Sequence, residues 1–169
     1  MRRSGVFVSA IAILSLSAFC SALAAGSVDA VERRVPPEPG ALDNAIAEAS
    51  SGDVLILLPG RHSGPVVLDR PVTLDGKGKA LLEGNGKGSV VSVTGKDIIV
   101  RGLDIRGSGS QHQKVDAGVK LGRSAERAVV ESNRIVGNLY GIDVRGAHDS
   151  TVRGNIIVGR TDRRMNDRG

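Results

Sequence analysis

Cysteine is almost missing from this chain of 169 residues, since Cys20 is the only one. Cys20 lies in an apolar N-terminal segment that we expect to be removed, so the mature chain would contain no thiol. This excludes disulfides and metal sites with cysteine ligands. Aromatic residues make up only 2% of the chain, and tryptophan is missing. Without aromatic rings on which bases could stack, we expect no nucleic-acid partner.

Long apolar runs are missing as well, except at the N-terminus. Arg2 and Arg3 precede the apolar run Val6–Phe19, and Ala22-Leu23-Ala24 supplies the small residues that signal peptidase requires. We therefore predict a cleaved Sec-type signal peptide over residues 1–24, with cleavage after Ala30 as the alternative. No later run reaches the roughly 18 apolar residues of a membrane-spanning helix, so we predict no transmembrane segment in the mature chain. Loss of the signal leaves 21 basic and 18 acidic residues, a net charge of +3.

A repeat is what the sequence does contain. Residues 118–138 and 141–159 align with an offset of 22, and both carry short apolar bursts separated by Gly and Asn. The aligned pairs are Asn133 and Asn155, Val130 and Val152, Ile135 and Ile157, Val136 and Val158, and Gly137 and Gly159. A period of about 22 residues is typical of a solenoid in which each repeat is one coil.

The segments before this repeat extend the same pattern. Residues 25–40 are polar and proline-rich, which predicts a linker or an extended N-terminal arm. Apolar residues at helical spacing then predict a short helix that covers the open end of the core; they are Leu42, Ala45, Ile46 and Ala49. Pairs of apolar residues recur from there to Ile105, with no helix-length pattern that could connect parallel strands. We therefore predict an all-β fold, a right-handed parallel β-helix over residues 41–169 that is truncated at its C-terminal end.

Polar residues inside the repeat are expected to serve the stacking of coils. Asn133 and Asn155 occupy one corner, where Asn tolerates a left-handed backbone and can bond to the Asn of the next coil. This predicts a structural Asn ladder. Glu131 beside Arg153, and Lys120 beside Asp143, predict ion pairs between coils. Residues 108–116 do not repeat, and we predict a loop there.

Residues for catalysis or metal binding are scarce. The best catalytic group is a cluster near the second repeat, although a solvated outer face explains it better: Tyr140, Asp143, Arg145, His148 and Asp149. Asp97 and Asp104 are too scattered for a hydrolase, which needs paired carboxylates. His62, His112 and His148 fall on different coils, so they do not form a cluster of metal ligands. The weak metal candidates are His112 and Met165, and Met165 lies in a polar segment that breaks the coil pattern. We therefore expect no catalytic residue and no cofactor in this segment.

Several stretches nevertheless resemble a known family. Residues 42–93 are similar to the N-terminal coils of pectate-lyase-like β-helix proteins in general. VRGLDIRGSG, DAGVKL, NLYGIDVRG and GNIIVGRTDRRMNDRG resemble the NosD family, periplasmic maturation proteins of nitrous oxide reductase with carbohydrate-binding-type (CASH) repeats. The resemblance covers about residues 41–169.

The resemblance implies a non-enzymatic accessory protein in the periplasm. Its implied partners are a membrane ABC transporter, a copper chaperone and nitrous oxide reductase, and copper is implied only in this way. Residues that match the family's final motif form the expected partner surface: Arg163, Arg164, Met165, Asn166, Asp167 and Arg168. The alternatives are a polysaccharide lyase, epimerase or hydrolase, and a carbohydrate-binding surface module.

Overall fold

The computed structural model describes residues 30–161. The predicted signal peptide and the predicted partner surface Arg163–Arg168 lie outside this range. In chain order the elements are β1 (Glu32–Val35), α1 (Ala41–Glu48), β2 (Val54–Leu57), β3 (Gly60–Ser63), β4 (Val66–Leu68), β5 (Thr73–Glu83), β6 (Val91–Val93), β7 (Ile99–Arg106), β8 (Ala117–Leu121), β9 (Val129–Glu131), β10 (Arg134–Asn138), β11 (Tyr140–Val144), β12 (Thr151–Arg153) and β13 (Ile156–Gly159).

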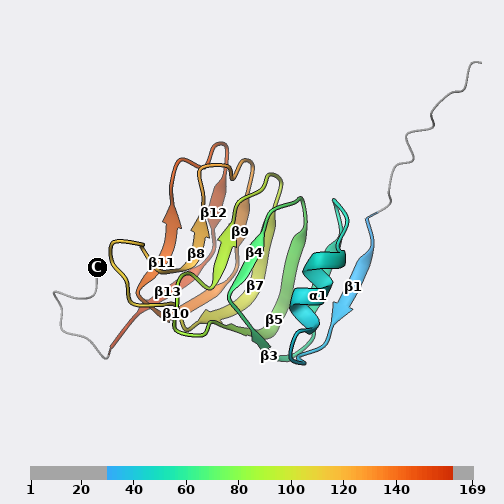
Figure 1. Ribbon diagram of the computed structural model, residues 1–169, viewed down its shortest axis with the longest axis horizontal. Helices are drawn as coiled ribbons and strands as arrows, with labels where there is room; N and C mark the ends of the chain where they lie inside the picture. The colour runs from blue at the N-terminus through green and yellow to red at the C-terminus, as the bar shows by residue number, and fades with distance from the viewer. Residues whose placement is uncertain (1–29, 162–169) are drawn as a thin grey trace, which may run out of the picture.

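Each described strand pairs in parallel with its equivalent in a neighbouring coil. One sheet has the order β1-β2-β5-β7-β10-β13 and also holds β3, β9 and β12, while β11-β8-β6-β4 form the other. The strands lie side by side along the long axis of the molecule (Figure 1). The parallel β-helix predicted from the repeat is confirmed.

Apolar side chains stack in rows between the two sheets. Val130 pairs with Val100 and Val152, and Ile135 pairs with Ile105 and Ile157, as the aligned repeats predict. Val100, Val130, Ile105 and Ile135 are fully buried. One aligned pair is wrong: Gly159 pairs with Asn138 rather than Gly137. The register slips there because Gly137 has a φ of 64° and bends the strand out of the ladder.

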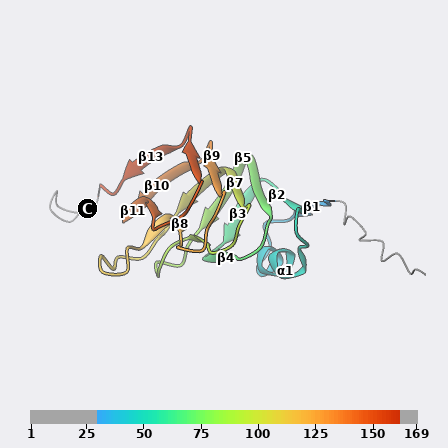
Figure 2. The ribbon, with the colours of Figure 1, turned by 90° about the horizontal axis from the view of Figure 1, so that it is seen from above.

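The N-terminal end of the solenoid is built from α1 and β1. Helix α1 confirms the predicted capping helix, and its Leu42 is buried against the core. It lies beside β1 at one end of the molecule (Figure 2). Strand β1 lies within residues 25–40, where a linker or an extended N-terminal arm is predicted, and its pairing with β2 adds residues 32–35 to the sheet. The segment ERRV buries only Val35, so it shows too little alternation to be recognised as a strand.

The Asn corner forms a hydrogen-bonded ladder. Asn133 Nδ2 donates to Asn155 Oδ1 at 3.0 Å and to Val100 O at 3.0 Å, and Asn133 Oδ1 accepts from Leu103 N at 3.1 Å. The left-handed backbone lies one residue earlier than expected, at Ser132, with a φ of 55°. The Asn is therefore selected for its amide rather than for its backbone freedom.

A second buried Asn does the same work at the other end of β10. Asn138 Nδ2 donates to Ile105 O at 2.9 Å, and its Oδ1 accepts from Ser108 N at 3.0 Å. Asn138 aligns with no second Asn, so the repeat alone does not indicate its role. Its role depends on the loop that follows β7, which brings Ser108 against it.

Charges on the outer faces pair only in part as expected. Arg153 Nη2 lies 2.7 Å from Glu131 Oε2, which confirms that pair. Lys120 and Asp143 are neighbours in register but form no ion pair. Lys120 Nζ instead donates to Lys114 O at 2.7 Å, and Arg145 Nε donates to Asp143 Oδ2 at 3.0 Å. Local partners outcompete the cross-coil pair because they lie within easier reach of these side chains.

Candidate partner surface

The non-repeating loop of residues 108–116 is anchored at both ends and exposed in the middle. At the first end, Ser108 is buried and its Oγ accepts a hydrogen bond from Leu139 N at 2.9 Å. At the second end, Asp116 is buried and its Oδ2 accepts from Gln111 N at 2.9 Å. Residues 110–114 between them are exposed. The loop is therefore held in one place while it presents its centre to solvent.

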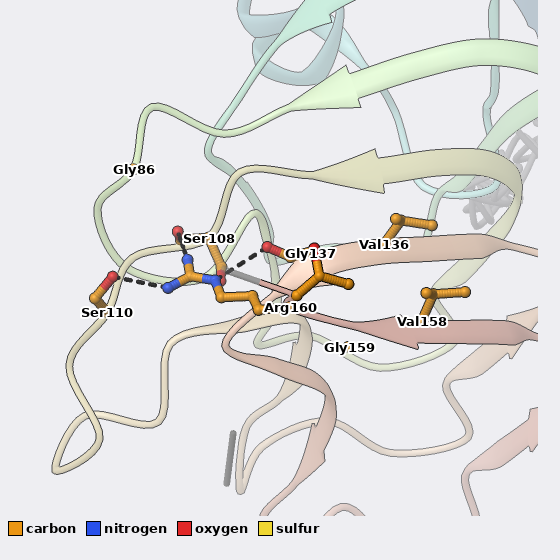
Figure 3. Close-up of a pocket in the computed structure, with 9 residues that line it drawn as sticks. Gly86, Ser108, Ser110, Val136, Gly137, Val158, Gly159 and Arg160 are labelled. Atoms are coloured by element: carbon orange, nitrogen blue, oxygen red, sulfur yellow. Dashed lines mark hydrogen bonds between the residues drawn. The ribbon is translucent and has the colours of Figure 1, made fainter. Parts of the chain in front are cut away.

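Arg160 connects this loop to the last coil. Its Nη2 donates to Ser108 O at 2.9 Å and Gly109 O at 3.0 Å, and its Nη1 donates to Ser110 Oγ at 2.9 Å. Its Nε donates to Gly137 O at 3.1 Å. Figure 3 shows the guanidinium group between the loop and β10. One side chain thus joins segments that are 50 residues apart in the chain.

A surface pocket of about 490 Å³ opens beside Arg160. Val136 and Val158, which are partners on neighbouring strands, supply its apolar lining, and Ser108 and Ser110 supply hydroxyl groups. Thr161, the last residue that the structure describes, also lines it. The loop of residues 108–116 and the end of the last described coil therefore meet at one place on the surface.

Sequence reasoning missed Arg160, although the alignment contained the evidence. NRIVGN (133–138) aligns with NIIVGR (155–160), so that Arg160 stands where the preceding coil has Asn138. Asn138 bonds to carbonyl groups within its own and the preceding coil, whereas the longer Arg160 reaches the loop of residues 108–116. The substitution of Arg160 for the Asn of the preceding coil breaks the repeat, and this break could have indicated a special role for Arg160.

The structure brings only part of the weak catalytic candidate cluster together. Tyr140 Oη lies 3.1 Å from His112 Nδ1 in the loop, with the two rings edge to face. Asp143 is bonded to Arg145, and Asp149 adopts a left-handed turn conformation with a φ of 51°. Tyr140 thus belongs to a loop contact, Asp143 to an ion pair and Asp149 to a turn, while Arg145 and His148 line a common pocket.

The carboxylates of Asp97 and Asp104 form ion pairs with arginines. Hydrogen bonds from Arg106 and then Arg134 keep the pKa of Asp104 below its usual value, even though burial opposes this. The hydrogen bond from Arg127 lowers the pKa of Asp97 in the same way. Carboxylates that stay ionised in this way do not provide the proton that a general acid must supply.

Metal ligands do not gather in the part of the chain that the structure describes. No group of three or more His, Cys, Asp or Glu residues lies close enough to hold an ion there. His112 contacts Tyr140 rather than a second histidine or a sulfur ligand, which does not fit the soft ligand set that copper(I) prefers. Met165, the other candidate, lies outside the described residues.

Comparison with solved structures defines the class of the fold. The chain superposes on a pectin methylesterase in complex with a hexasaccharide, with a TM-score of 0.55 and 16% sequence identity. The match covers 81% of this chain and 57% of the esterase. At this identity the likeness shows the fold alone, and the chain is a parallel β-helix protein with pectate-lyase-like architecture.

Comparison with curated proteins is more specific. The chain is 34% identical over 113 residues to "Probable ABC transporter binding protein NosD" of Pseudomonas aeruginosa and 32% identical over 110 residues to the protein of the same name from Stutzerimonas stutzeri. These matches cover 67% and 65% of this chain. They confirm the resemblance to NosD proteins.

The matches are partial on the relatives' side. The chain spans 26% and 25% of the length of the two curated relatives. No protein-family model matches the chain. Within residues 30–161, no helix is long and apolar enough to cross a membrane.

Proposed function

We propose that this chain acts in a periplasmic accessory protein that serves as a scaffold in copper-centre assembly of nitrous oxide reductase. The observation that carries the proposal is the similarity to two proteins named as NosD, whose name refers to binding an ABC transporter. In this role the chain works with that transporter and a copper chaperone, and it catalyses no reaction itself.

The geometry supports a binding role through the surface that combines the loop of residues 108–116 with Arg160. Repeating positions of the solenoid are occupied by stacking side chains, and Asn133 is an example. The loop does not repeat, and three hydrogen bonds from Arg160 fix it against the last coil, while a fourth reaches Gly137 O. A fixed and exposed surface of this kind suits recognition of a partner, because little conformational entropy is lost on binding.

The test exchanges the matching segment of NosD in Stutzerimonas stutzeri for this chain. We expect the chimaera to restore copper to nitrous oxide reductase in a strain that lacks its own NosD, as measured by copper content of the purified enzyme. An Arg160→Ala chimaera should restore less copper at equal periplasmic abundance, while a Lys79→Ala chimaera, changed in the turn of β5, serves as the control.

Two results would contradict the proposal. The first is a nitrous oxide reductase without copper although the chimaera is present in the periplasm at the normal level. The second is the release of unsaturated products when the full chain is incubated with uronate polymers, because this would make the protein a lyase.

A further inference from the structure

Two arginines meet at a turn of the last two coils, on the side of the β11-β8-β6-β4 sheet. The pocket there has a volume of about 500 Å³ and is lined by Arg123, Arg145, Gly146 and His148. Leu121 pairs with Val144 in the next coil, so the residues two positions on, Arg123 and Gly146, also face each other. A Cβ atom on Gly146 would lie 3.7 Å from Arg123 Cγ. The aliphatic part of Arg123 therefore lies over a glycine.

The turn is open beside Arg123 on the side of the last coil. Apart from Arg123 Cγ and the neighbours of Gly146 in the chain, no atom of the described residues is found within 4 Å of the position that a Cβ on Gly146 would occupy. The turn therefore has a notch there, with the Arg123 side chain at its edge.

The described residues that line this notch include two arginines and no carboxylate. Arg145 Nε is bonded to Asp143 Oδ2, but within residues 30–161 Arg123 forms no ion pair. The nearby Glu126 is already shared by Lys96 and Arg127. Arg123 and Arg145 line the same pocket from adjacent coils, so their like charges disfavour each other and favour an anion between them.

We propose that Arg123, Arg145 and His148 form a binding site for the oxyanion of a soluble ligand, a phosphate or a carboxylate. A guanidinium group presents parallel N–H donors that match two oxygens of either anion. The His148 ring provides a further donor at the wall of the same pocket. The pocket volume is within the range of small-molecule sites. This site is separate from the surface around Arg160 and does not depend on the proposed accessory role.

The experiment is isothermal titration of the full chain at low ionic strength, with inorganic phosphate and D-galacturonate as separate probes. Low salt is needed because exposed charges are screened otherwise. Arg123→Ala should weaken binding of the preferred probe about tenfold, the effect of losing a charge-assisted hydrogen bond. Arg123→Lys should give an intermediate loss, since it keeps the charge but not the paired donors. The probe that binds more tightly identifies the anion.

Arg153→Ala is the matched control. It removes the same charge from an exposed side chain on the other sheet, where Arg153 pairs with Glu131. We expect its affinity for the probe to equal that of the unchanged chain. The inference is overturned if neither probe binds at millimolar concentration, or if Arg153→Ala weakens binding as much as Arg123→Ala. Circular dichroism spectra of all variants verify that a lost signal reflects the site and not unfolding.

Discussion

Replacing Asn133 by alanine tests whether the Asn corner holds the coils together. Asn133 is only 1% exposed, and its side chain bonds to Leu103 N, Val100 O and Asn155 Oδ1. Asn133→Ala removes the hydrogen bonds to the buried backbone groups Leu103 N and Val100 O, and a buried polar group that is left without a partner costs about 1–3 kcal/mol. We therefore expect the free energy of unfolding to fall by about 2–5 kcal/mol, measured by urea denaturation of the full chain followed by circular dichroism.

An exposed asparagine provides the control for this prediction. Asn85 accepts one hydrogen bond, from Lys87 N at 3.1 Å, in a solvent-exposed turn. Asn85→Ala should change the free energy of unfolding by about 0.5 kcal/mol or less. Asn138→Ala should resemble Asn133→Ala, because Asn138 bonds to buried backbone groups in the same manner. The reasoning is refuted if Asn133→Ala costs less than about 1 kcal/mol, or no more than Asn85→Ala.

Three further predictions follow from the same structure. Gly118→Ala would place a Cβ 2.5 Å from Ile135 Cγ2, so thermal unfolding should show a loss of about 1–3 kcal/mol; Gly159→Ala, with no atom within 4 Å of its Cβ, should be close to neutral. Burial raises the pKa of the Asp75 carboxyl, but hydrogen bonds from basic neighbours lower it more, so its pKa in the folded chain is below the usual value. Ionised Asp75 therefore stabilises the fold fully above about pH 4, and this contribution is lost as the pH falls through the lowered pKa. Asp75→Asn should make the loss of stability between pH 6 and pH 3 shallower in urea titrations, and an unchanged slope would contradict this. Arg160→Ala should speed amide hydrogen exchange in residues 108–116 and leave exchange in β5 unchanged; equal protection in both chains would show that Arg160 does not hold the loop.

Much of the fold could be predicted because coil stacking leaves a periodic record in the sequence. A parallel coil places equivalent residues on top of each other, so Val152 continues the apolar row that begins in the core with Val100 and Val130. The same reasoning predicts the Glu131–Arg153 pair, since a fixed offset places these two side chains side by side. β1 was missed because a strand of four residues with one buried side chain has almost no period.

The candidate site could be located only in part. That residues 108–116 form a loop follows from their failure to repeat, and this requires no coordinates. The hydrogen bond between Tyr140 and His112 could not be predicted from the sequence, which placed Tyr140 with Asp143 instead. This contact depends on where the loop folds back onto the coils.

By itself, the sequence determined that this chain is a β-solenoid, which of its side chains stack, and its resemblance to NosD proteins. These properties depend on local sequence or on the repeat, and a structural repeat is visible in the linear sequence as a repeated pattern of residues. Only the tertiary structure decided that Arg160 replaces an Asn of the corner and fastens the loop of residues 108–116, and that Arg123 and Arg145 share a pocket. Both arrangements arise from contacts between coils at turns, where the register slips and side chains of different length reach different partners.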